Sequence, residues 1–251
     1  MKFNGKVKIN KIEFMTNDTF KMTVVKPEGI DIKAGQFFMI KNIGLYPLLN
    51  RPISVSFFTK EKIEFGIKIA GKETKNMSKL NKGDEIYLLG PLGNGFELKE
   101  KYNKVLLVGG GIGIEPLKAA AMELEKINIE TKSFLGFKNE CFDIKEFKNF
   151  SDEVITFSEE ENVGDFVGYP TDKLIEEFEK IKYDAVFTCG PKILMDKTNE
   201  ICKSYNIEVQ LLLEEKMACG IGACLGCTCK TVDGYKKVCK DGPMFYGNEV
   251  I

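Results

Sequence analysis

The 251-residue chain contains no histidine, and this absence narrows its chemistry. Imidazole is the usual base of catalytic triads and a common zinc ligand, so histidine-based triads and most zinc hydrolase sites are excluded. If the chain is an enzyme, its reaction should need little proton transfer by side chains. Hydride and electron transfer on bound cofactors meets that condition, because the cofactor carries the difficult step.

The sequence also lacks a charge excess, a membrane-length apolar run and a signal-like N-terminus. Lys plus Arg number 36 and Asp plus Glu 37, so neither nucleic acid nor an anionic membrane is expected as a partner. The longest apolar run, around residues 105–114, contains glycines and is too short to span a bilayer. The first six residues have no apolar core. These features predict a cytoplasmic protein with reduced thiols.

The first hundred residues contain short apolar runs of β type, separated by turn residues. Residues 74–80 are the one short helical pattern among them. Six strands without a long helix predict a small antiparallel barrel over residues 1–100. The predicted strands are 6–14, 19–25, 36–43, 53–58, 62–70 and 85–89.

From Lys104 onward strands and helices alternate, which predicts a parallel sheet in an α/β domain over residues 101–213. The fold class is therefore a multidomain α+β chain, with residues 214–251 as a small C-terminal domain. Strands are predicted at 105–108, 131–137, 154–157, 185–188 and 208–213, and helices at 115–127, 171–181 and 192–205.

A glycine-rich turn, GGGIG at residues 109–113, joins the first α/β strand to its helix. Strand, glycine turn and helix is the dinucleotide-binding arrangement, because glycines let the backbone approach a pyrophosphate near the helix N-terminus. The string at 111–116 is G-x-G-x-x-P, a departure from G-x-G-x-x-G. Cys189-Gly190-Pro191 ends a later strand, where open α/β sheets place ligands, although Cys189 alone also fits a small buried hydrophobe.

Five of the eight cysteines lie between positions 219 and 239. Cys219, Cys224, Cys227 and Cys239 give the spacing C-x4-C-x2-C-x11-C, whose first three members match the plant-type [2Fe-2S] pattern. Glycines between them leave backbone amides free to point at sulfur. Zinc is the alternative, but structural zinc sites usually have two C-x2-C pairs, and only one is present here. Cys229 is expected to be a spectator.

Arg51-Pro52-Ile53-Ser54 stands at the start of a predicted barrel strand. The planar guanidinium suits a diphosphate, and the serine hydroxyl and backbone suit the edge of a flat heterocycle. A surface arginine before a strand is the alternative interpretation. Residues 71–74, where a glycine turn enters the short helix, are a second phosphate candidate, with an ordinary hairpin exit as the alternative.

In this order the motifs resemble the ferredoxin-NADP reductase superfamily, and more closely the electron-transfer subunits of NAD-linked (class 1B) dihydroorotate dehydrogenase. The resemblance runs essentially end to end and is strongest at residues 215–224 and 238–243. It implies an FAD-binding barrel, an NAD-binding α/β domain and a C-terminal [2Fe-2S] domain, with no separate catalytic side chain. The implied residues are Arg51, Pro52, Ile53, Ser54, Gly66, Ile67, Lys68, Glu73 and Thr74 for FAD; Gly110, Gly111, Gly113, Cys189, Gly190 and Pro191 for NAD; and Cys219, Cys224, Cys227 and Cys239 for the cluster.

Two positions depart from the superfamily pattern. The family has G-x-G-T where this chain has GKET at 71–74, so Glu73 is expected to point away from the diphosphate and contribute only its backbone. Ile53 replaces a tyrosine that stands against the flavin in many members, in agreement with this subunit type. NAD is expected on family grounds; Glu140 can bind a ribose hydroxyl, whereas Lys138 can pair with a 2′-phosphate.

The resemblance also implies a separate FMN-containing catalytic subunit that oxidises dihydroorotate in pyrimidine biosynthesis, in a heterotetramer with two copies of each chain. Electrons would enter at the cluster, pass to FAD and leave as hydride on NAD. The chain has no room for an added (β/α)8 barrel of about 250 residues, so it should not oxidise dihydroorotate alone. The alternatives are a subunit of a ferredoxin:NAD(P) oxidoreductase or sulfite reductase complex and, outside redox chemistry, a zinc-binding interaction module.

Overall fold

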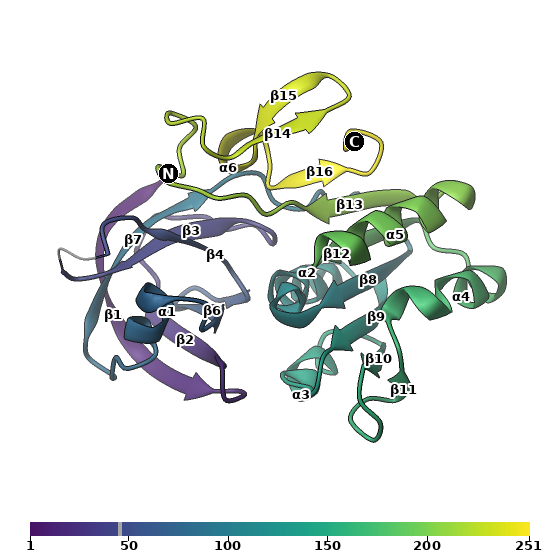
Figure 1. Cartoon of the computed structure of the whole chain (residues 1–251), viewed down its shortest axis with the longest axis horizontal. Coiled ribbons are helices and arrows are strands. Elements are labelled where there is room, and N and C mark those ends of the chain that lie inside the picture. Colours follow the sequence, from purple (N-terminus) through teal and green to yellow (C-terminus); the bar gives the residue numbers. More distant parts are fainter. Residues whose placement is uncertain (45–46) are drawn as a thin grey trace.

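The computed structural model describes residues 1–44 and 47–251, which form two sheet-centred bodies with a smaller unit lying across both (Figure 1). The N-terminal body is a seven-stranded antiparallel sheet of order β4-β3-β7-β1-β2-β6-β5, with one short helix, α1 (Lys72–Met77). Its strands are β1 (Phe3–Phe14), β2 (Thr19–Val25), β3 (Phe37–Asn42), β4 (Arg51–Ser54), β5 (Phe57–Phe58), β6 (Lys62–Lys68) and β7 (Glu85–Leu92).

The two edge strands of this sheet, β4 and β5, follow each other in the chain and close the barrel. The Val55 N–H donates to the carbonyl of Gln36 at 3.0 Å, and the Ser56 N–H donates to that of Glu64 at 3.0 Å. The predicted antiparallel barrel is therefore confirmed. The single strand predicted at 53–58 was wrong, because Val55 and Ser56 bond to different strands and divide it in two. The predicted helix at 74–80 begins and ends earlier, as α1.

The second body is a seven-stranded sheet of order β11-β10-β9-β8-β12-β13-β16, in which all pairs except β13 with β16 are parallel. The predicted α/β sheet is confirmed. Its strands are β8 (Lys104–Gly110), β9 (Glu130–Phe137), β10 (Glu153–Ser158), β11 (Phe166–Val167), β12 (Ala185–Cys189), β13 (Glu208–Leu212) and β16 (Met244–Tyr246), and its helices are η1 (Gly111–Gly113), α2 (Ile114–Lys126), α3 (Ile144–Phe147), η2 (Pro170–Lys173), α4 (Leu174–Lys180) and α5 (Lys192–Ser204).

Strand β8 shows why the sequence there is continuously apolar. Val105 and Leu107 pack into the core that contains residues of α2, whereas Leu106 and Val108 pack into the core that contains residues of α4 and α5. A parallel strand covered by helices on both faces has no solvent side, so it loses the alternation seen in β1.

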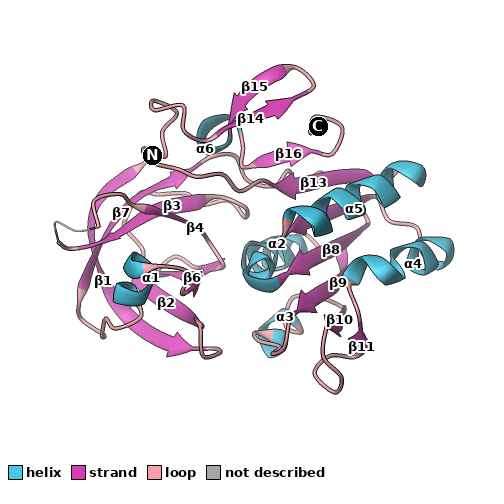
Figure 2. Ribbon diagram, viewed as in Figure 1, coloured by secondary structure: helices cyan, strands magenta, loops and turns pink. Residues whose placement is uncertain are grey.

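The C-terminal tail contains a short hairpin and one helical turn. Residues 228–241 form the hairpin of β14 (Thr228–Thr231) and β15 (Gly234–Lys237) and the single turn α6 (Val238–Asp241), at the top of the view in Figure 2. The chain then returns to the second body, where β16 pairs antiparallel with β13. The last strand of the predicted 214–251 domain therefore belongs to the α/β sheet.

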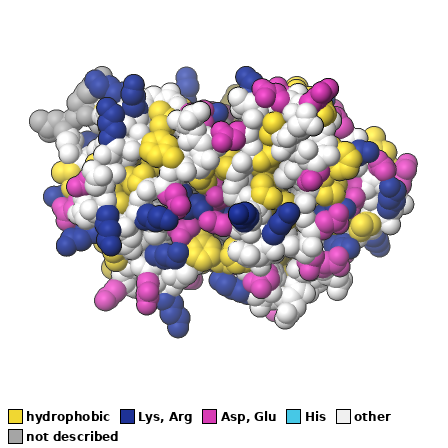
Figure 3. All heavy atoms as spheres, turned by 90° about the horizontal axis from the view of Figure 1, so that it is seen from below, with side chains coloured by type: hydrophobic (Ala, Val, Ile, Leu, Met, Phe, Trp, Pro, Cys, Tyr) yellow, Lys and Arg dark blue, Asp and Glu magenta, His cyan; other side chains and the backbone are white. Residues whose placement is uncertain are grey.

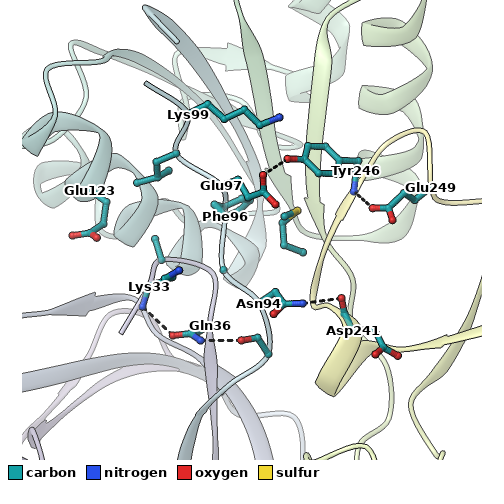
Figure 4. A pocket seen from close by; sticks show the side chains of 15 residues that line it. Lys33, Gln36, Asn94, Phe96, Glu97, Lys99, Glu123, Asp241, Tyr246 and Glu249 are labelled. Carbon is teal, nitrogen blue, oxygen red and sulfur yellow. Dashed lines mark hydrogen bonds between the residues drawn. The ribbon is translucent and has the colours of Figure 1, made fainter. Parts of the chain in front are cut away.

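The three units meet around a cavity of about 800 Å³ (Figure 4). Hydrogen bonds cross it: the Gln36 side chain donates to the carbonyl of Gly93 at 2.8 Å, and the Tyr246 hydroxyl donates to Glu97 at 2.5 Å. Asn94 donates to the carbonyl of Asp241 at 2.9 Å. The last two of these bonds join the tail to the segment that links β7 to β8.

The face of the molecule seen in Figure 3 carries no dominant sign of charge. Figure 3 shows lysines and acidic side chains interspersed over one face of both bodies. Within the described residues, no helix is both long enough and apolar enough to cross a membrane.

Candidate functional site

The four predicted cluster cysteines come together in the loop before β14 and in α6, as two pairs. The thiol of Cys219 lies beside that of Cys224, and the thiol of Cys227 lies beside that of Cys239. Cys227 and Cys239 are each 2% exposed, whereas Cys224 is exposed. The outer pair therefore faces solvent and the inner pair faces the protein.

Backbone amides point at three of these sulfur atoms, as the glycine spacing predicts. The Ile221 and Cys224 N–H groups donate to Cys219 Sγ at 3.5 and 3.4 Å. The Gly222 N–H donates to Cys239 Sγ at 3.1 Å, and the Cys239 N–H to Cys227 Sγ at 3.4 Å. Slight burial raises the pKa of the Cys219 thiol, but the backbone N–H groups outweigh it and lower that pKa to about 6.

The arrangement fits two metal atoms better than one. Among residues 1–44 and 47–251, no three His, Cys, Asp or Glu side chains converge so as to hold a single metal ion. A structural zinc ion needs four ligands around one centre, whereas a [2Fe-2S] cluster takes two thiolates on each iron. Two adjacent thiol pairs, with amides directed at sulfur, are the donor set for the second case.

The cysteine loop packs directly on the barrel. Gly220 has φ +70°, and a Cβ there would lie 2.5 Å from Met39 Cγ, so only glycine lets the loop approach β3 this closely. Met39 in turn pairs with Pro52 of β4. The loop is thus separated from the predicted FAD strand by β3. Sequence reasoning missed this contact because nothing local in Met39 marks it.

Arg51 to Ser54 form the edge strand β4, and all four residues are half-buried. Arg51, the only arginine of the chain, donates from Nη1 to the carbonyls of Leu49 and Asn50 at 2.7 and 3.3 Å. These bonds hold one side of the guanidinium fork in place. Gly66, Ile67 and Lys68 lie on β6, which contacts β4 where the barrel closes.

Glu73 and Thr74 lie in the first turn of α1. The carboxylate of Glu73 is 1% exposed and accepts a hydrogen bond from the Asn42 N–H at 2.7 Å, so the side chain is tied to the end of β3. The Thr74 hydroxyl accepts from the Ala70 and Gly71 N–H groups at 3.0 and 3.2 Å. Both side chains therefore support the turn into α1.

The glycine turn and the Cys189-Gly190-Pro191 segment lie side by side, since Gly109 and Cys189 are register partners in β8 and β12. A Cβ on Gly113 would lie 2.6 Å from Gly190 Cα, which shows how closely the two backbones approach. Cys189 is 2% exposed, and burial raises the pKa of its thiol well above the ordinary value. It is therefore a protonated, buried side chain below this turn.

A cavity of about 780 Å³ lies between the dinucleotide segments and Lys68, while the other predicted flavin residues are outside its lining. Its lining includes Lys68 of β6, the turn at Gly110–Gly113 and the Gly190-Pro191 segment. Cys229 lines the same cavity from the hairpin β14–β15. Lys138 and Glu140 are exposed at the carboxyl end of β9, beside β10, outside this lining.

Two comparisons with known sequences cover this chain. A family model described as the iron-sulfur cluster binding domain of dihydroorotate dehydrogenase B matches residues 214–251. The dihydroorotate dehydrogenase B (NAD(+)) electron transfer subunit of Clostridium perfringens is 41% identical over 250 residues, covering 99% of this chain and 97% of the relative. That of Clostridium acetobutylicum is 41% identical over 221 residues, covering 88% and 87%.

A solved structure described under flavin-based electron bifurcation, the NADH-dependent reduced ferredoxin-NADP oxidoreductase, superposes with a TM-score of 0.89. It is 28% identical and covers 98% of this chain and 89% of the other. The likeness extends over both bodies and the tail, so the three-unit arrangement is shared as a whole.

Proposed function

This chain belongs to the family of electron-transfer subunits of NAD-linked dihydroorotate dehydrogenase B, and on that premise we propose that it passes electrons from a dihydroorotate-oxidising partner subunit to NAD. The observation that carries the proposal is the spatial order of the three sites. The exposed thiol pair, the buried thiol pair, β3 and β4 follow one another, and the cavity beside β6 faces the glycine turn.

When bound, a [2Fe-2S] cluster would supply one-electron chemistry, and FAD would supply the exchange between single electrons and the hydride that NAD+ accepts. The residues of the chain bind and separate these groups. The four thiols would hold the cluster, and Arg51 would pair with the flavin diphosphate. Ser54 and the β4 backbone would donate hydrogen bonds to the edge of the flavin ring. The Gly111–Gly113 turn and the Gly190-Pro191 segment admit the dinucleotide.

The partner is proposed to be an FMN-containing catalytic subunit, in a complex with two copies of each chain that serves pyrimidine biosynthesis. The exposed position of Cys224 supports electron entry from outside this chain. NAD is the proposed acceptor, since both relatives above are named as NAD(+) enzymes. We place the complex in the cytoplasm, where NAD and pyrimidine precursors are used.

Reconstitution tests the proposal. The purified chain, loaded with FAD and iron–sulfur cluster, is mixed anaerobically with the catalytic subunit, dihydroorotate and NAD+. NADH formation that requires both chains is expected, and a matched sample without this chain serves as the control. Absence of NADH from a fully loaded pair would refute the proposal.

A second candidate follows from the TM-score of 0.89 with the ferredoxin-NADP oxidoreductase. In that case reduced ferredoxin would replace dihydroorotate as the electron source. The same reconstitution with reduced ferredoxin in place of the catalytic subunit distinguishes the two candidate functions. The main proposal predicts that this sample forms little NADH.

A further inference from the structure

Five charged side chains lie in the seam between the barrel and the α/β body. Lys118 of α2 is fully buried and contacts Asp143, Glu146 Oε2 at 3.0 Å and Glu115 Oε2 at 3.3 Å. Lys21 of β2 contacts the same two partners from the barrel side, Asp143 at 3.1 Å and Glu146 at 2.5 Å. Asp143 and Glu146 thus each bind one lysine from each body.

Burial of these charged side chains costs free energy. Lys21, Asp143, Glu115 and Lys118 are buried, whereas the Glu146 side chain is 43% exposed. Burying ionisable groups is expensive unless they are paired, and removal of one partner leaves an uncompensated charge. Asp143 also has φ 57°, in the left-handed region, at the start of α3. Its carboxylate is held there by the two lysines.

Glu115 brings the network to the cofactor segments. It is 1% exposed, and neither of its carboxylate oxygens has a hydrogen-bond partner among the described residues. A methyl group on Gly66 would collide with the Cγ and carboxyl group of Glu115, so this side chain rests on the backbone of β6. Lys21 is the register partner of Gly66, so β2 and β6 present both residues to α2 together.

The contact between Gly66 and Glu115 lies close to the cavity of about 780 Å³. Lys68, two residues after Gly66, lies on the same face of β6 and lines the cavity. Glu115 lies two residues after Gly113, which lines the opposite wall. The contact between Gly66 and Glu115 therefore stands directly behind the gap between the predicted flavin strand and the dinucleotide turn.

Burial favours the neutral form of Glu115. Burial raises the pKa of Glu115; Lys118 lowers it and Asp143 raises it again, with Lys21 also facing the group, and the net shift is upward. With Glu115 protonated, the two lysines balance Asp143 and Glu146. A neutral carboxyl can then remain against β6 without an unpaired charge.

We propose that this network sets the separation between β6 and the Gly111–Gly113 turn, and that Glu115 and Lys118 are positioning residues for hydride transfer between FAD and the dinucleotide. The inference rests on the proposed function. Reacting atoms must approach within about 3–3.5 Å, and an error of about 1 Å can cost two orders of magnitude in rate. The volume that fills the space between β6 and α2 behind the gap would hold that distance. Excess volume there separates the two segments, and a methyl group on residue 66 can take the place of the Glu115 side chain.

The test first adds a methyl group that collides with Glu115 and then removes the Glu115 side chain. Gly66→Ala adds the colliding methyl group, and Gly66→Ala combined with Glu115→Ala removes the side chain that it meets. FAD-loaded, cluster-loaded chain is mixed anaerobically with NADH or 4-deuterated NADH, and flavin bleaching is followed in single turnover. We expect Gly66→Ala to slow reduction by at least about ten-fold per bound FAD, with a larger isotope effect, and the double variant to recover most of the rate. The FAD and iron content of each variant is measured.

Hydrogen exchange of the amides in β6 and in the Gly111–Gly113 turn, measured without NADH, gives a readout independent of activity. Exchange should rise in both segments in Gly66→Ala and fall back in the double variant. Lys21→Met provides a second route if Gly66→Ala does not fold, and it should slow flavin reduction by at least about three-fold. Lys11→Met, which breaks an exposed Lys11–Glu13 pair within β1, is the matched control and should leave the rate unchanged.

Flavin reduction at the unaltered rate in Gly66→Ala and in Lys21→Met would overturn the proposal. A double variant as slow as Gly66→Ala would overturn it as well, because the effect would not pass through Glu115. If NADH fails to reduce the flavin of the unaltered chain, the proposed function itself is wrong, which is a different result.

Discussion

The two halves of the cysteine loop differ in what surrounds them. Cys219 and Cys224 lie towards solvent, and the pKa of Cys219 is lowered to about 6 by backbone N–H groups that outweigh its slight burial. Cys227 and Cys239 lie in the apolar core with residues of β3 and β7, and burial followed by the neighbouring Cys227 thiol raises the pKa of Cys239 to about 12. One half can face a partner, and the other half is part of the fold.

The largest effect is expected when one cysteine in each half of the loop is replaced. Cys224→Ser and Cys227→Ser should both lose the cluster absorbance and its iron, while FAD stays bound. Cys227→Ser should also lower the free energy of unfolding by about 1–3 kcal/mol, because the hydroxyl of the introduced serine is buried without a hydrogen-bond partner. Iron analysis and thermal unfolding measure the two effects.

Cys229→Ser is the matched control, since Cys229 lines the cavity instead of joining either thiol pair. It should keep its iron, its absorbance and its electron transfer. Equal loss of iron in Cys229→Ser and Cys224→Ser would show that the four ligands are wrongly assigned.

The next largest effect concerns the contact between the cysteine loop and the barrel at Gly220. Gly220→Ala combines a left-handed φ of +70° with a collision at Met39, so it should cost more than about 1–2 kcal/mol and slow electron transfer from the cluster to the flavin. Gly234→Ala has φ +107° but no atom within 4 Å of the new methyl group, so it measures backbone strain alone. Stopped-flow reduction of the flavin through the partner compares them; identical rates would mean that the contact with β3 is irrelevant.

A smaller effect is expected at the FAD-binding end of the proposed electron path. Arg51→Lys removes the fork that bonds to the carbonyls of Leu49 and Asn50, so FAD binding should weaken by about ten-fold. Fluorescence titration of the FAD-free chain measures it. Unchanged FAD affinity, with the cluster intact, would remove Arg51 from the flavin site.

The smallest effect concerns the hairpin behind the loop. Glu249 accepts from Lys236 at 2.7 Å and from the Tyr246 N–H at 2.8 Å. Burial raises the pKa of Glu249, but these bonds outweigh it and hold the pKa below the ordinary value. Its stabilisation is therefore complete above the unfolded pKa and is lost as pH falls through the folded one.

Glu249→Gln should accordingly lower Tm by about 1–2 °C at neutral pH, and the difference from the unaltered protein should shrink on acidification below about pH 4. A difference that stays constant or grows at low pH would contradict this assignment. Differential scanning calorimetry across pH measures it.

The sequence predicted whatever depends on local pattern. Period-2 and continuous apolar runs marked the strands of both bodies, and the cysteine spacing marked the thiols that form the two pairs. The return of β16 to the sheet was missed because three residues carry no periodicity. The network of Lys21, Glu115 and Lys118 was missed for another reason. Charged residues in a sequence are usually assigned to solvent-exposed faces, and these residues come together only when the two bodies pack.

The route through the cluster is tested most directly by reducing the complex of this chain and its catalytic subunit with dihydroorotate, without NAD+, and following the flavin and cluster absorbance together. In the unaltered complex both bands should bleach. In the Cys224→Ser complex the FAD of this chain should stay oxidised although dihydroorotate still reduces the partner. Bleaching of that FAD at the normal rate without a cluster would contradict the account.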